Sequence, residues 1–240
     1  MIIAGLQKTT LIDYPGKIAC VVFLAGCNFR CPWCYSSELV LPLKIVAQPR
    51  ISEKEFLDFL RERKGLLEGV VICGGEPTIN KELPQFIEKV KVLGYPVKLD
   101  TNGSNPKMLK DLVNTKLINY VAMDIKGPLG QYEKVIGEGI TTEHIKESVE
   151  FLKQGKIDFE FRTTCVPGIH SKEDFLKIAK WIGGSGAPLG SHPNVKYYLQ
   201  NFRAEKTIDP EFEKIKPFPR EFLEDIVKEI SPYFKTCQLR

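Results

Sequence analysis

Apolar runs and segments of helical periodicity alternate along the chain. Residues 18–24 (Ile-Ala-Cys-Val-Val-Phe-Leu) are apolar without interruption, which is typical of a strand buried on both faces. Further strands are predicted over residues 70–73, 97–100, 120–123, 159–164 and 195–199. Between the strands, apolar residues recur at helical spacing, as they do over residues 83–90. Because strands that alternate with helices form right-handed βα units, this pattern predicts an α/β fold with a parallel sheet.

Polar residues mark where several of the helices begin. Ser52 and Glu55 form a capping box before an apolar helix, and Asn105-Pro106 supplies an N-cap followed by proline at the first helical position. Ser171 is expected to cap a later helix. Six βα units are fewer than the eight of a closed barrel. We therefore expect an open, partial (βα)6 TIM-like barrel, with polar and glycine-rich residues at the carboxyl ends of its strands.

Composition and charge exclude several classes of protein. The 240 residues are 43% hydrophobic and 27% charged, which argues against a disordered chain. The formal net charge of +4 is too small to predict a nucleic-acid partner. The apolar start reaches Lys8 without forming a signal peptide, and the longest apolar run, residues 18–27, is half of the roughly 20 residues that a membrane helix needs. We therefore expect a cytoplasmic protein with neither a membrane nor a nucleic acid as partner.

Three of the seven cysteines are crowded into one loop after the first predicted strand, Cys27-Asn-Phe-Arg-Cys31-Pro-Trp-Cys34. Three thiols cannot all pair in intramolecular disulfides, so metal binding is the natural use of this loop. Structural zinc usually takes four ligands, and an iron–sulfur cluster is normally held by four cysteines. On three local cysteines, a [4Fe–4S] cluster would keep one iron open for an exogenous ligand. Zinc with a distant fourth ligand, or buried thiols without a metal, are the alternatives.

The motifs around this loop, taken in order, identify a family. The Cys-x3-Cys-x2-Cys loop is accompanied by Asp13-Tyr-Pro-Gly16, Gly74-Gly-Glu-Pro77, Leu99-Asp-Thr-Asn-Gly103, Asp124-Ile-Lys126 and Val166-Pro-Gly168. From about Gly5 to Gln200, the chain resembles the radical S-adenosylmethionine (radical SAM) enzymes. Within them it is similar to the activating enzymes of glycyl radical enzymes. It most resembles the anaerobic ribonucleoside-triphosphate reductase activating protein group, with the pyruvate formate-lyase activating enzyme as a cousin.

The resemblance implies a domain organisation and a set of cofactors. One radical SAM domain would cover residues 1–240, with a cluster loop at 26–35, a core at about 16–202 and a C-terminal helix and tail at 203–240. Cys27, Cys31 and Cys34 would hold one [4Fe–4S] cluster, whose open iron chelates S-adenosyl-L-methionine. Reductive cleavage of S-adenosylmethionine would give a 5′-deoxyadenosyl radical that generates a glycyl radical on a partner enzyme. A flavodoxin or a ferredoxin-like protein would donate the electron, and the labile cluster implies anaerobic conditions.

The resemblance also implies which residues contact S-adenosylmethionine. Gly75 lies in a segment that would line the methionine part, where a missing Cβ lets backbone groups approach the ligand. Beyond the cluster cysteines and the cofactor, no catalytic residue such as an acid–base triad is expected. The expected contacts with S-adenosylmethionine are Trp33, Tyr35, Gly74, Gly75, Glu76, Asp100, Asn102, Asp124, Ile125, Lys126 and Arg162. Asp100 and Asp124 are also candidates to share a monovalent cation, since carboxylates suit hard ions.

Several of these residues have a purely structural explanation as well. The glycine pair at 74–75 suits a tight turn, and Asn102-Gly103 suits a turn that needs positive φ. Arg162 can pair with Glu160 or with another neighbouring acid. The chain also departs from its relatives, which often have histidine at the position of Tyr35 and near the end of the sixth strand, where this chain has no histidine.

The remaining histidines and cysteines are interpreted as structural residues. His144, His170 and His192 lack ligand spacing and are expected at the surface or at helix caps. Four cysteines lie apart from one another, and three of them fall in apolar strands as small core residues: Cys20, Cys73, Cys165 and Cys237. No second cysteine-rich module for an auxiliary cluster is therefore expected.

Three classes of function fit the sequence. The first is an activating enzyme that acts on a glycine of a partner protein. The second is a radical SAM enzyme that acts on a small molecule or nucleotide, such as a relative of 7-carboxy-7-deazaguanine synthase. The third is a non-catalytic metal protein that carries zinc or an electron-transfer cluster on the three cysteines.

Overall fold

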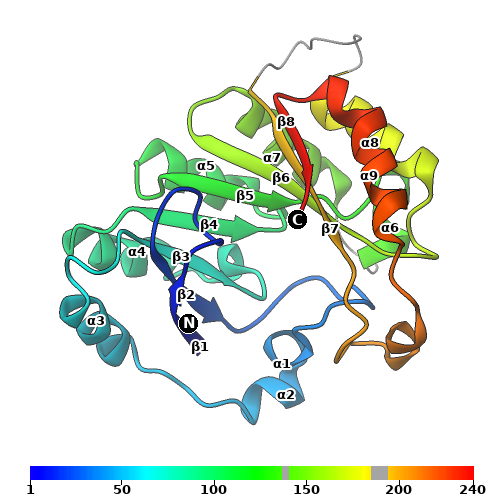
Figure 1. The fold of residues 1–240 in the computed structure, drawn as a ribbon. Coiled ribbons are helices and arrows are strands. Elements are labelled where there is room, and N and C mark those ends of the chain that lie inside the picture. The colour runs from blue at the N-terminus through cyan, green and yellow to red at the C-terminus, as the bar shows by residue number, and fades with distance from the viewer. Residues whose placement is uncertain (137–140, 185–193) are drawn as a thin grey trace. The chain divides into compact units, whose positions relative to one another are not determined.

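The computed structural model describes residues 1–136, 141–184 and 194–240 (Figure 1). These residues form two compact units. The first contains residues 1–28, 36–101 and 105–121, and the second contains the described part of residues 29–35, 102–104 and 122–240. His192 lies outside the described residues, so the prediction about it is not tested. The prediction of a single radical SAM domain stays a prediction.

Strands of the first unit pair in the order in which they occur in the chain. They are β1 (Ile3–Thr10), β2 (Ala19–Leu24), β3 (Gly69–Gly74) and β4 (Val97–Thr101). β1 is antiparallel to β2, whereas β2, β3 and β4 run parallel to one another. All residues of β4 and the first four of β3 are buried, which is why the apolar runs here predict strands that are covered on both faces.

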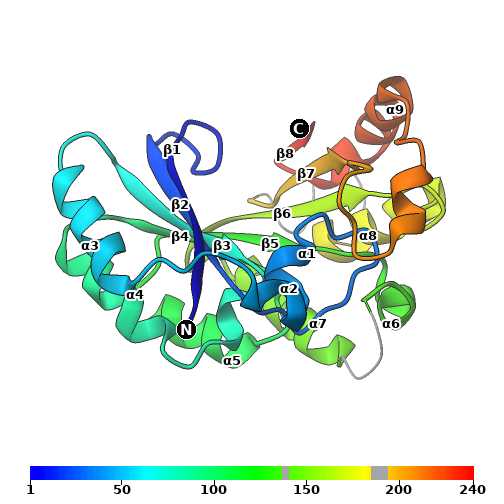
Figure 2. The ribbon, with the colours of Figure 1, turned by 90° about the horizontal axis from the view of Figure 1, so that it is seen from below.

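Two of the helices in the first unit begin where the sequence predicts caps. The elements are α1 (Ser37–Val40), α2 (Pro42–Val46), α3 (Glu53–Glu62), the 3-10 helix η1 (Pro77–Ile79), α4 (Leu83–Val92) and α5 (Pro106–Asn114). The capping box of α3 is confirmed, and the Asn105 side chain caps α5 by accepting from the N–H of Met108. α3 and α4 pack side by side through Phe56 and Phe86, whose ring centroids are 5.5 Å apart (Figure 2).

The later strands of the second unit also pair in parallel. β5 (Tyr120–Asp124) begins in the first unit and ends in the second. β6 (Asp158–Cys165), β7 (Lys196–Asn201) and β8 (Thr236–Leu239) pair in that order. Arg240 follows β8, and its guanidinium donates to both carboxylate oxygens of buried Glu160, at 2.9 and 3.1 Å. Glu160 is thereby paired with Arg240.

Helices of the second unit include the one that Ser171 was predicted to cap and a C-terminal helix. The elements are η2 (Leu129–Gln131), α6 (Tyr132–Ile136), α7 (Thr142–Lys153), α8 (Lys172–Gly183), η3 (Pro210–Lys214), α9 (Arg220–Ile230) and η4 (Ser231–Tyr233). Ser171 and Asp174 form a reciprocal capping box at the start of α8. His144 is exposed in the first turn of α7, as predicted. Within the described residues, no helix is both long and apolar enough to cross a membrane.

The predicted α/β class and all six predicted strands are confirmed. Two further strands, β1 and β8, were not predicted. β1 pairs with a single neighbour, and most of its residues are only partly buried or exposed, so its pattern lacks the continuous apolar run that marks β2. β8 has four residues and is also incompletely buried. Both strands border only one other strand of their unit, which weakens the sequence signal of burial.

Candidate cofactor site

The chain that leads into Cys27 is held by the glycine-rich segment after β3. The N–H of Gly75 donates to the carbonyl of Leu24 at 2.8 Å, and the N–H of Glu76 donates to the carbonyl of Gly26 at 2.7 Å. The N–H of Gly26 donates in turn to the carbonyl of Leu39 at 2.8 Å. The start of the cluster loop is therefore fixed by backbone hydrogen bonds within the first unit.

Gly75 occupies a position where a side chain does not fit. A Cβ atom built on Gly75 would lie 2.0 Å from the carbonyl oxygen of Gly26, and this is backbone that cannot rotate away. Gly74 has a φ of +121°, and its Cβ would lie 2.2 Å from the carbonyl oxygen of Leu24. Both glycines are thus required by the close approach of the two backbones.

Glu76 is a fully buried carboxylate that accepts hydrogen bonds from residues of the first unit. Its Oε1 accepts from the N–H of Thr78 at 3.0 Å and from the hydroxyl of Thr101 at 2.7 Å, and the Thr78 hydroxyl donates to it as well. These bonds tie the turn after β3 to the end of β4. The predicted cofactor-contact residue Glu76 therefore has a structural role in this turn.

Asp100 forms an ion pair with Lys98, two residues earlier on β4. The Lys98 side chain is 1% exposed and that of Asp100 is 11% exposed. A buried ammonium of this kind is tolerated only when it is paired. The shared monovalent cation that was predicted for Asp100 and Asp124 stays a prediction, and each carboxylate has a cationic side chain as partner within its own unit.

The second unit anchors the part of the cluster loop that carries Cys31 and Cys34. The N–H of Cys34 donates to the carbonyl of Cys31 at 3.0 Å. The N–H groups of Ile208 and Asp209 donate to the carbonyls of Cys34 and Pro32, at 3.1 and 2.9 Å. This brings a remote segment, just before η3, against the loop.

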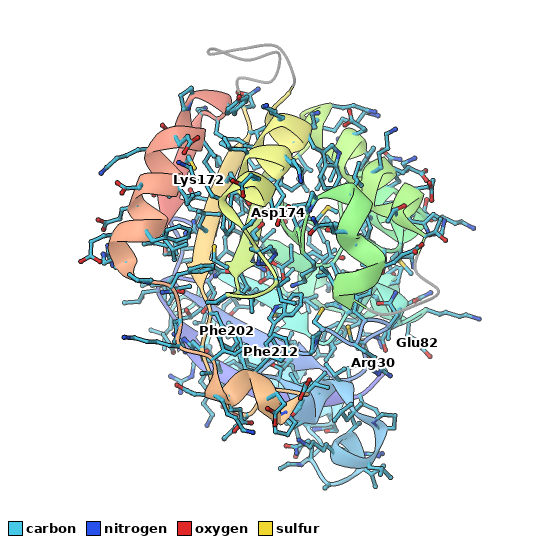
Figure 3. All side chains as sticks on the ribbon, turned by 90° about the vertical axis from the view of Figure 1, so that its right-hand side faces the viewer. Arg30, Glu82, Lys172, Asp174, Phe202 and Phe212 are labelled. Carbon is cyan, nitrogen blue, oxygen red and sulfur yellow. The ribbon has the colours of Figure 1, made fainter. Side chains whose placement is uncertain are left out.

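Trp33 lies in the core of the second unit, between these two cysteines. Its side chain is 3% exposed, and its ring lies 6.3 Å from that of Phe212. Phe212 lies beside Phe202 in turn (Figure 3). Tyr35, which the sequence also predicts as a cofactor contact, is 52% exposed.

The strongest ion-pair network of the predicted site joins Asp124, Lys126 and Arg162. Oδ1 of Asp124 accepts from Nε of Arg162 at 2.9 Å, and Oδ2 accepts from Nζ of Lys126 at 3.0 Å. Burial alone would raise the pKa of the Asp124 carboxyl, but Arg162 and Lys126 lower that pKa to about 2. Burial would likewise lower the pKa of Lys126, but Asp124 and the Cys31 and Cys34 sulfurs raise it. All three side chains are therefore charged at neutral pH.

Every backbone polar group of Ile125 and Lys126 has a hydrogen-bond partner in the second unit. The N–H of Ile125 donates to the carbonyl of Arg162 at 2.7 Å, and its carbonyl accepts from the Thr163 hydroxyl at 2.8 Å. The N–H of Lys126 donates to the Tyr132 hydroxyl oxygen at 2.9 Å. The Lys126 carbonyl faces a ring nitrogen of His170 at 2.9 Å. The backbone of the predicted cofactor contacts Ile125 and Lys126 is thus fixed by hydrogen bonds through both its N–H and its carbonyl groups.

The prediction that His170 is a surface or capping residue is wrong. His170 is 5% exposed, and its two ring nitrogens contact backbone groups of Val166 and Lys126. Its position four residues after Val166, in the turn that ends β6, returns the ring toward the strand ends. Tyr132 was also missed. The only sequence signal for either residue is its nearness to a predicted strand end.

Asn102, a predicted cofactor contact, forms a turn in the loop after β4. It is buried, and its Oδ1 accepts from the N–H of Ser104 at 2.9 Å, which forms an Asx turn. Gly103 follows with a φ of +76°, and a Cβ there would lie 2.0 Å from the Met123 methyl carbon. The side chain of Asn102 therefore shapes the loop after β4.

Two of the four isolated cysteines are buried core residues, as predicted, and the other two are partly buried. Cys20 and Cys165 are buried in β2 and β6, while Cys73 and Cys237 are partly buried in β3 and β8. Burial raises the pKa of Cys20 to about 12 and that of Cys237 to about 12 as well. These two thiols are therefore protonated and poor metal ligands at neutral pH.

The donor chemistry of the cluster loop fits an iron–sulfur cluster. Across the described ranges, no three His, Cys, Asp or Glu side chains are gathered in a group that would hold a metal ion. The loop nevertheless supplies three thiols within eight residues, and thiolates are the ligands that iron–sulfur clusters use. The Lys126 ammonium, whose pKa responds to the Cys31 and Cys34 sulfurs, offsets negative charge on them.

Comparison with known proteins identifies the family. A family model described as the radical SAM superfamily matches residues 21–182, which is more than half of the chain. A Methanocaldococcus jannaschii protein, named provisionally as a glycyl-radical enzyme activating enzyme, is 33% identical over 228 residues, 92% of this chain and 87% of that protein.

Relatives with two other names are similar over less of the chain. The pyruvate formate-lyase-activating enzyme of Streptococcus mutans is 26% identical over 193 residues, 75% of this chain and 73% of that enzyme. The 7-carboxy-7-deazaguanine synthase of Aquifex aeolicus is 29% identical over 154 residues, 56% of this chain and 64% of that enzyme.

Solved structures support the predicted TIM-like core. Streptococcus suis SuiB bound to S-adenosylmethionine superposes with a TM-score of 0.65 at 13% identity, over 92% of this chain and 51% of that chain. The chain thus spans about half the length of that protein, and the likeness concerns the fold alone. The family match over residues 21–182, together with the M. jannaschii relative, shows that the chain belongs to the radical SAM superfamily.

Proposed function

We propose that the chain is an activating enzyme that generates a glycyl radical on a partner enzyme, which we take to be an anaerobic ribonucleoside-triphosphate reductase. The observation that carries this proposal is the relative named for glycyl-radical enzyme activation, at 33% identity over 92% of the chain. The Streptococcus mutans relative, named for activation of pyruvate formate-lyase, supports the same reaction class. Membership of the radical SAM superfamily implies one [4Fe–4S] cluster and S-adenosylmethionine as cosubstrate.

Each candidate residue has a definite task in this proposal. Cys27, Cys31 and Cys34 would hold the cluster through their thiolates. When bound, the cluster and S-adenosylmethionine supply an electron and a 5′-deoxyadenosyl radical that removes a hydrogen atom from the partner's glycine. Gly75 keeps backbone groups accessible where a side chain would collide with Gly26.

Charged and backbone groups at the end of β5 would orient S-adenosylmethionine. Asp124 and Lys126 carry opposite charges, and Arg162 fixes the Asp124 carboxylate in one orientation. Because the backbone of Ile125 and Lys126 is already ordered by hydrogen bonds, little conformational entropy is lost when the ligand binds. A flavodoxin or ferredoxin-like protein is the electron donor in this proposal.

A second candidate function is supported by the Aquifex aeolicus relative. That protein is named as a 7-carboxy-7-deazaguanine synthase, and it is 29% identical over 56% of this chain. The alternative function is therefore radical chemistry on a small molecule or nucleotide. The Aquifex aeolicus relative matches less of the chain than the Methanocaldococcus jannaschii relative, which matches 92% of it. This difference favours the first candidate function.

Electron paramagnetic resonance of the partner tests the proposal. The chain is reconstituted with iron and sulfide without oxygen, reduced, and mixed with S-adenosylmethionine and purified anaerobic ribonucleoside-triphosphate reductase. We expect a glycyl-radical signal with the native chain and with Cys237→Ala, and none with Cys31→Ala. A silent spectrum with this reductase would contradict the proposed partner, and formation of a deazaguanine product would favour the second candidate.

A further inference from the structure

His170 lies between two parts of the second unit that the proposed function uses. One is the backbone of Lys126 at the end of β5, and the other is Trp33 in the cluster loop. The ring centroids of His170 and Trp33 are 6.2 Å apart, with the planes at 72°, which is an edge-to-face contact. Phe175 of α8 also packs against the imidazole, at 5.6 Å between ring centroids.

The hydrogen bonds of His170 determine its tautomer. Nδ1 lies 3.0 Å from the backbone nitrogen of Val166, whose N–H can only donate, so Nδ1 carries the lone pair. Nε2 must then carry the proton, and it donates to the Lys126 carbonyl at 2.9 Å. Burial lowers the pKa of His170, which favours this neutral form.

The neutral imidazole spans backbone groups that would otherwise be orphaned. A buried N–H or carbonyl that loses its partner costs about 1–3 kcal/mol. The hydrogen bond from His170 therefore favours one orientation of the Lys126 carbonyl. Tyr132 holds the N–H of the same residue, at 2.9 Å. The N–H and the carbonyl of Lys126 are thus both bound by buried side chains, Tyr132 of α6 and His170 of the turn before α8.

We propose that His170 is a positioning residue that couples the cluster loop to Lys126 and so orients Lys126 for S-adenosylmethionine. The coupling rests on the proposed radical SAM function, because Lys126 and the loop cysteines are its two binding groups. His170 acts through Trp33 and through the Lys126 carbonyl, and not by contact with the reacting atoms. A ring at this position keeps the loop packed, and two hydrogen bonds keep the peptide oriented.

Two substitutions separate the ring from the hydrogen bonds. His170→Phe keeps an aromatic ring against Trp33 and Phe175 but loses both bonds. His170→Gln keeps one acceptor and one donor but loses the ring. Tyr95→Phe is the matched control, because it removes one buried hydrogen bond, from Tyr95 to the Leu60 carbonyl, in the first unit.

The experiment measures S-adenosylmethionine binding to the reconstituted protein, together with backbone hydrogen exchange over residues 122–128. We expect His170→Phe to load iron and sulfide as the native chain does, but to bind S-adenosylmethionine at least about tenfold more weakly, with faster exchange. His170→Gln keeps the two hydrogen bonds but loses the contact with Trp33, so it should keep native exchange and bind S-adenosylmethionine about threefold more weakly. Tyr95→Phe should change neither the exchange nor the affinity. If His170→Phe does not fold, His170→Met replaces it as the variant without hydrogen bonds.

The outcomes distinguish this coupling from the proposed function. Native affinity and native exchange in His170→Phe or His170→Met would overturn the positioning role. Equal losses in His170→Gln and His170→Phe would overturn it too, because the hydrogen bonds would then not matter. If the native chain itself forms no cluster or binds no S-adenosylmethionine, the proposed function fails instead.

Discussion

Arg162 donates from Nε to Oδ1 of Asp124 at 2.9 Å, and so joins β6 to β5 across 38 residues of sequence. Lys126 occupies the other carboxylate oxygen at 3.0 Å. One carboxylate therefore fixes two cations at the end of β5. These two bonds connect three of the predicted cofactor residues directly to one another.

Replacing Arg162 tests whether this pairing orients Asp124. Arg162→Gln should weaken S-adenosylmethionine binding by about tenfold, because a charge-assisted bond worth about 1.5–3 kcal/mol is lost and Asp124 can rotate. Isothermal titration of the reconstituted protein measures the affinity. Arg61→Gln removes an exposed pair with Asp58 and should leave the affinity unchanged. Equal affinities for Arg162→Gln and the native chain would exclude the orienting role.

Asp124 should also give stability a defined dependence on pH. Its pKa is about 2 in the folded chain, below its ordinary value of 3.8, so its ion pairs stabilise the fold fully above the ordinary value. The stabilisation is lost as the pH falls from the ordinary value toward 2. The unfolding free energies of the native chain and of Asp124→Asn, measured in urea, should differ by a constant amount above about pH 5. The difference should shrink progressively as the pH falls from about 4 toward 2. A difference that grows in acid would contradict the assignment.

Gly75→Ala should damage the start of the cluster loop. The new Cβ would lie 2.0 Å from the Gly26 carbonyl oxygen, and Gly26 directly precedes Cys27. Backbone must then shift, and we expect a loss of about 2 kcal/mol or more in unfolding free energy together with incomplete cluster loading. Gly130→Ala is the matched control, since a Cβ there meets no atom within 4 Å. Iron and sulfide analysis beside urea unfolding measures both effects, and native loading of Gly75→Ala would contradict the steric argument.

Lys98→Met should be strongly destabilising. It leaves Asp100 with its carboxylate in a buried position and without the Lys98 ammonium, and breaking a buried pair from one side costs about 3–5 kcal/mol. The double variant Lys98→Met/Asp100→Leu should recover most of that loss, because no charge is then left buried. Lys54→Met, at an exposed pair, should cost less than about 1 kcal/mol. Urea unfolding of the four proteins gives these values, and a small loss for Lys98→Met would contradict the buried pairing.

Local sequence patterns were sufficient for most of the fold. The apolar runs predicted β2 and β3 because both strands are buried along nearly their whole length. The capping residues Ser52 and Ser171 fixed where α3 and α8 begin. β1 and β8 escaped prediction because partial exposure leaves no continuous apolar run. Partial exposure therefore separates the strands that were missed from those that were found.

Long-range partners could not be read from the sequence. Arg162 was weighed as a partner of Glu160 or of another neighbouring acid. It pairs with Asp124, 38 residues earlier, and Glu160 pairs with Arg240, 80 residues away. His170 belongs to none of the motifs that the sequence analysis used. Its contacts with Lys126 and Trp33 form only in the folded chain, where the turn after β6 places the imidazole beside them. The motif residues themselves were identified by resemblance, whereas the side chains that hold them in place depend on tertiary packing.

Transfer of a glycine hydrogen atom is the most direct test of the proposed reaction. Anaerobic ribonucleoside-triphosphate reductase is prepared with glycine deuterated at Cα, and 5′-deoxyadenosine is analysed by mass spectrometry after reaction with the reconstituted, reduced chain. A glycyl-radical activating enzyme should produce 5′-deoxyadenosine that carries one deuterium, in an amount that matches the glycyl radical and falls to background with Cys31→Ala. Unlabelled 5′-deoxyadenosine, or an amount that does not depend on the reductase, would contradict the activating function.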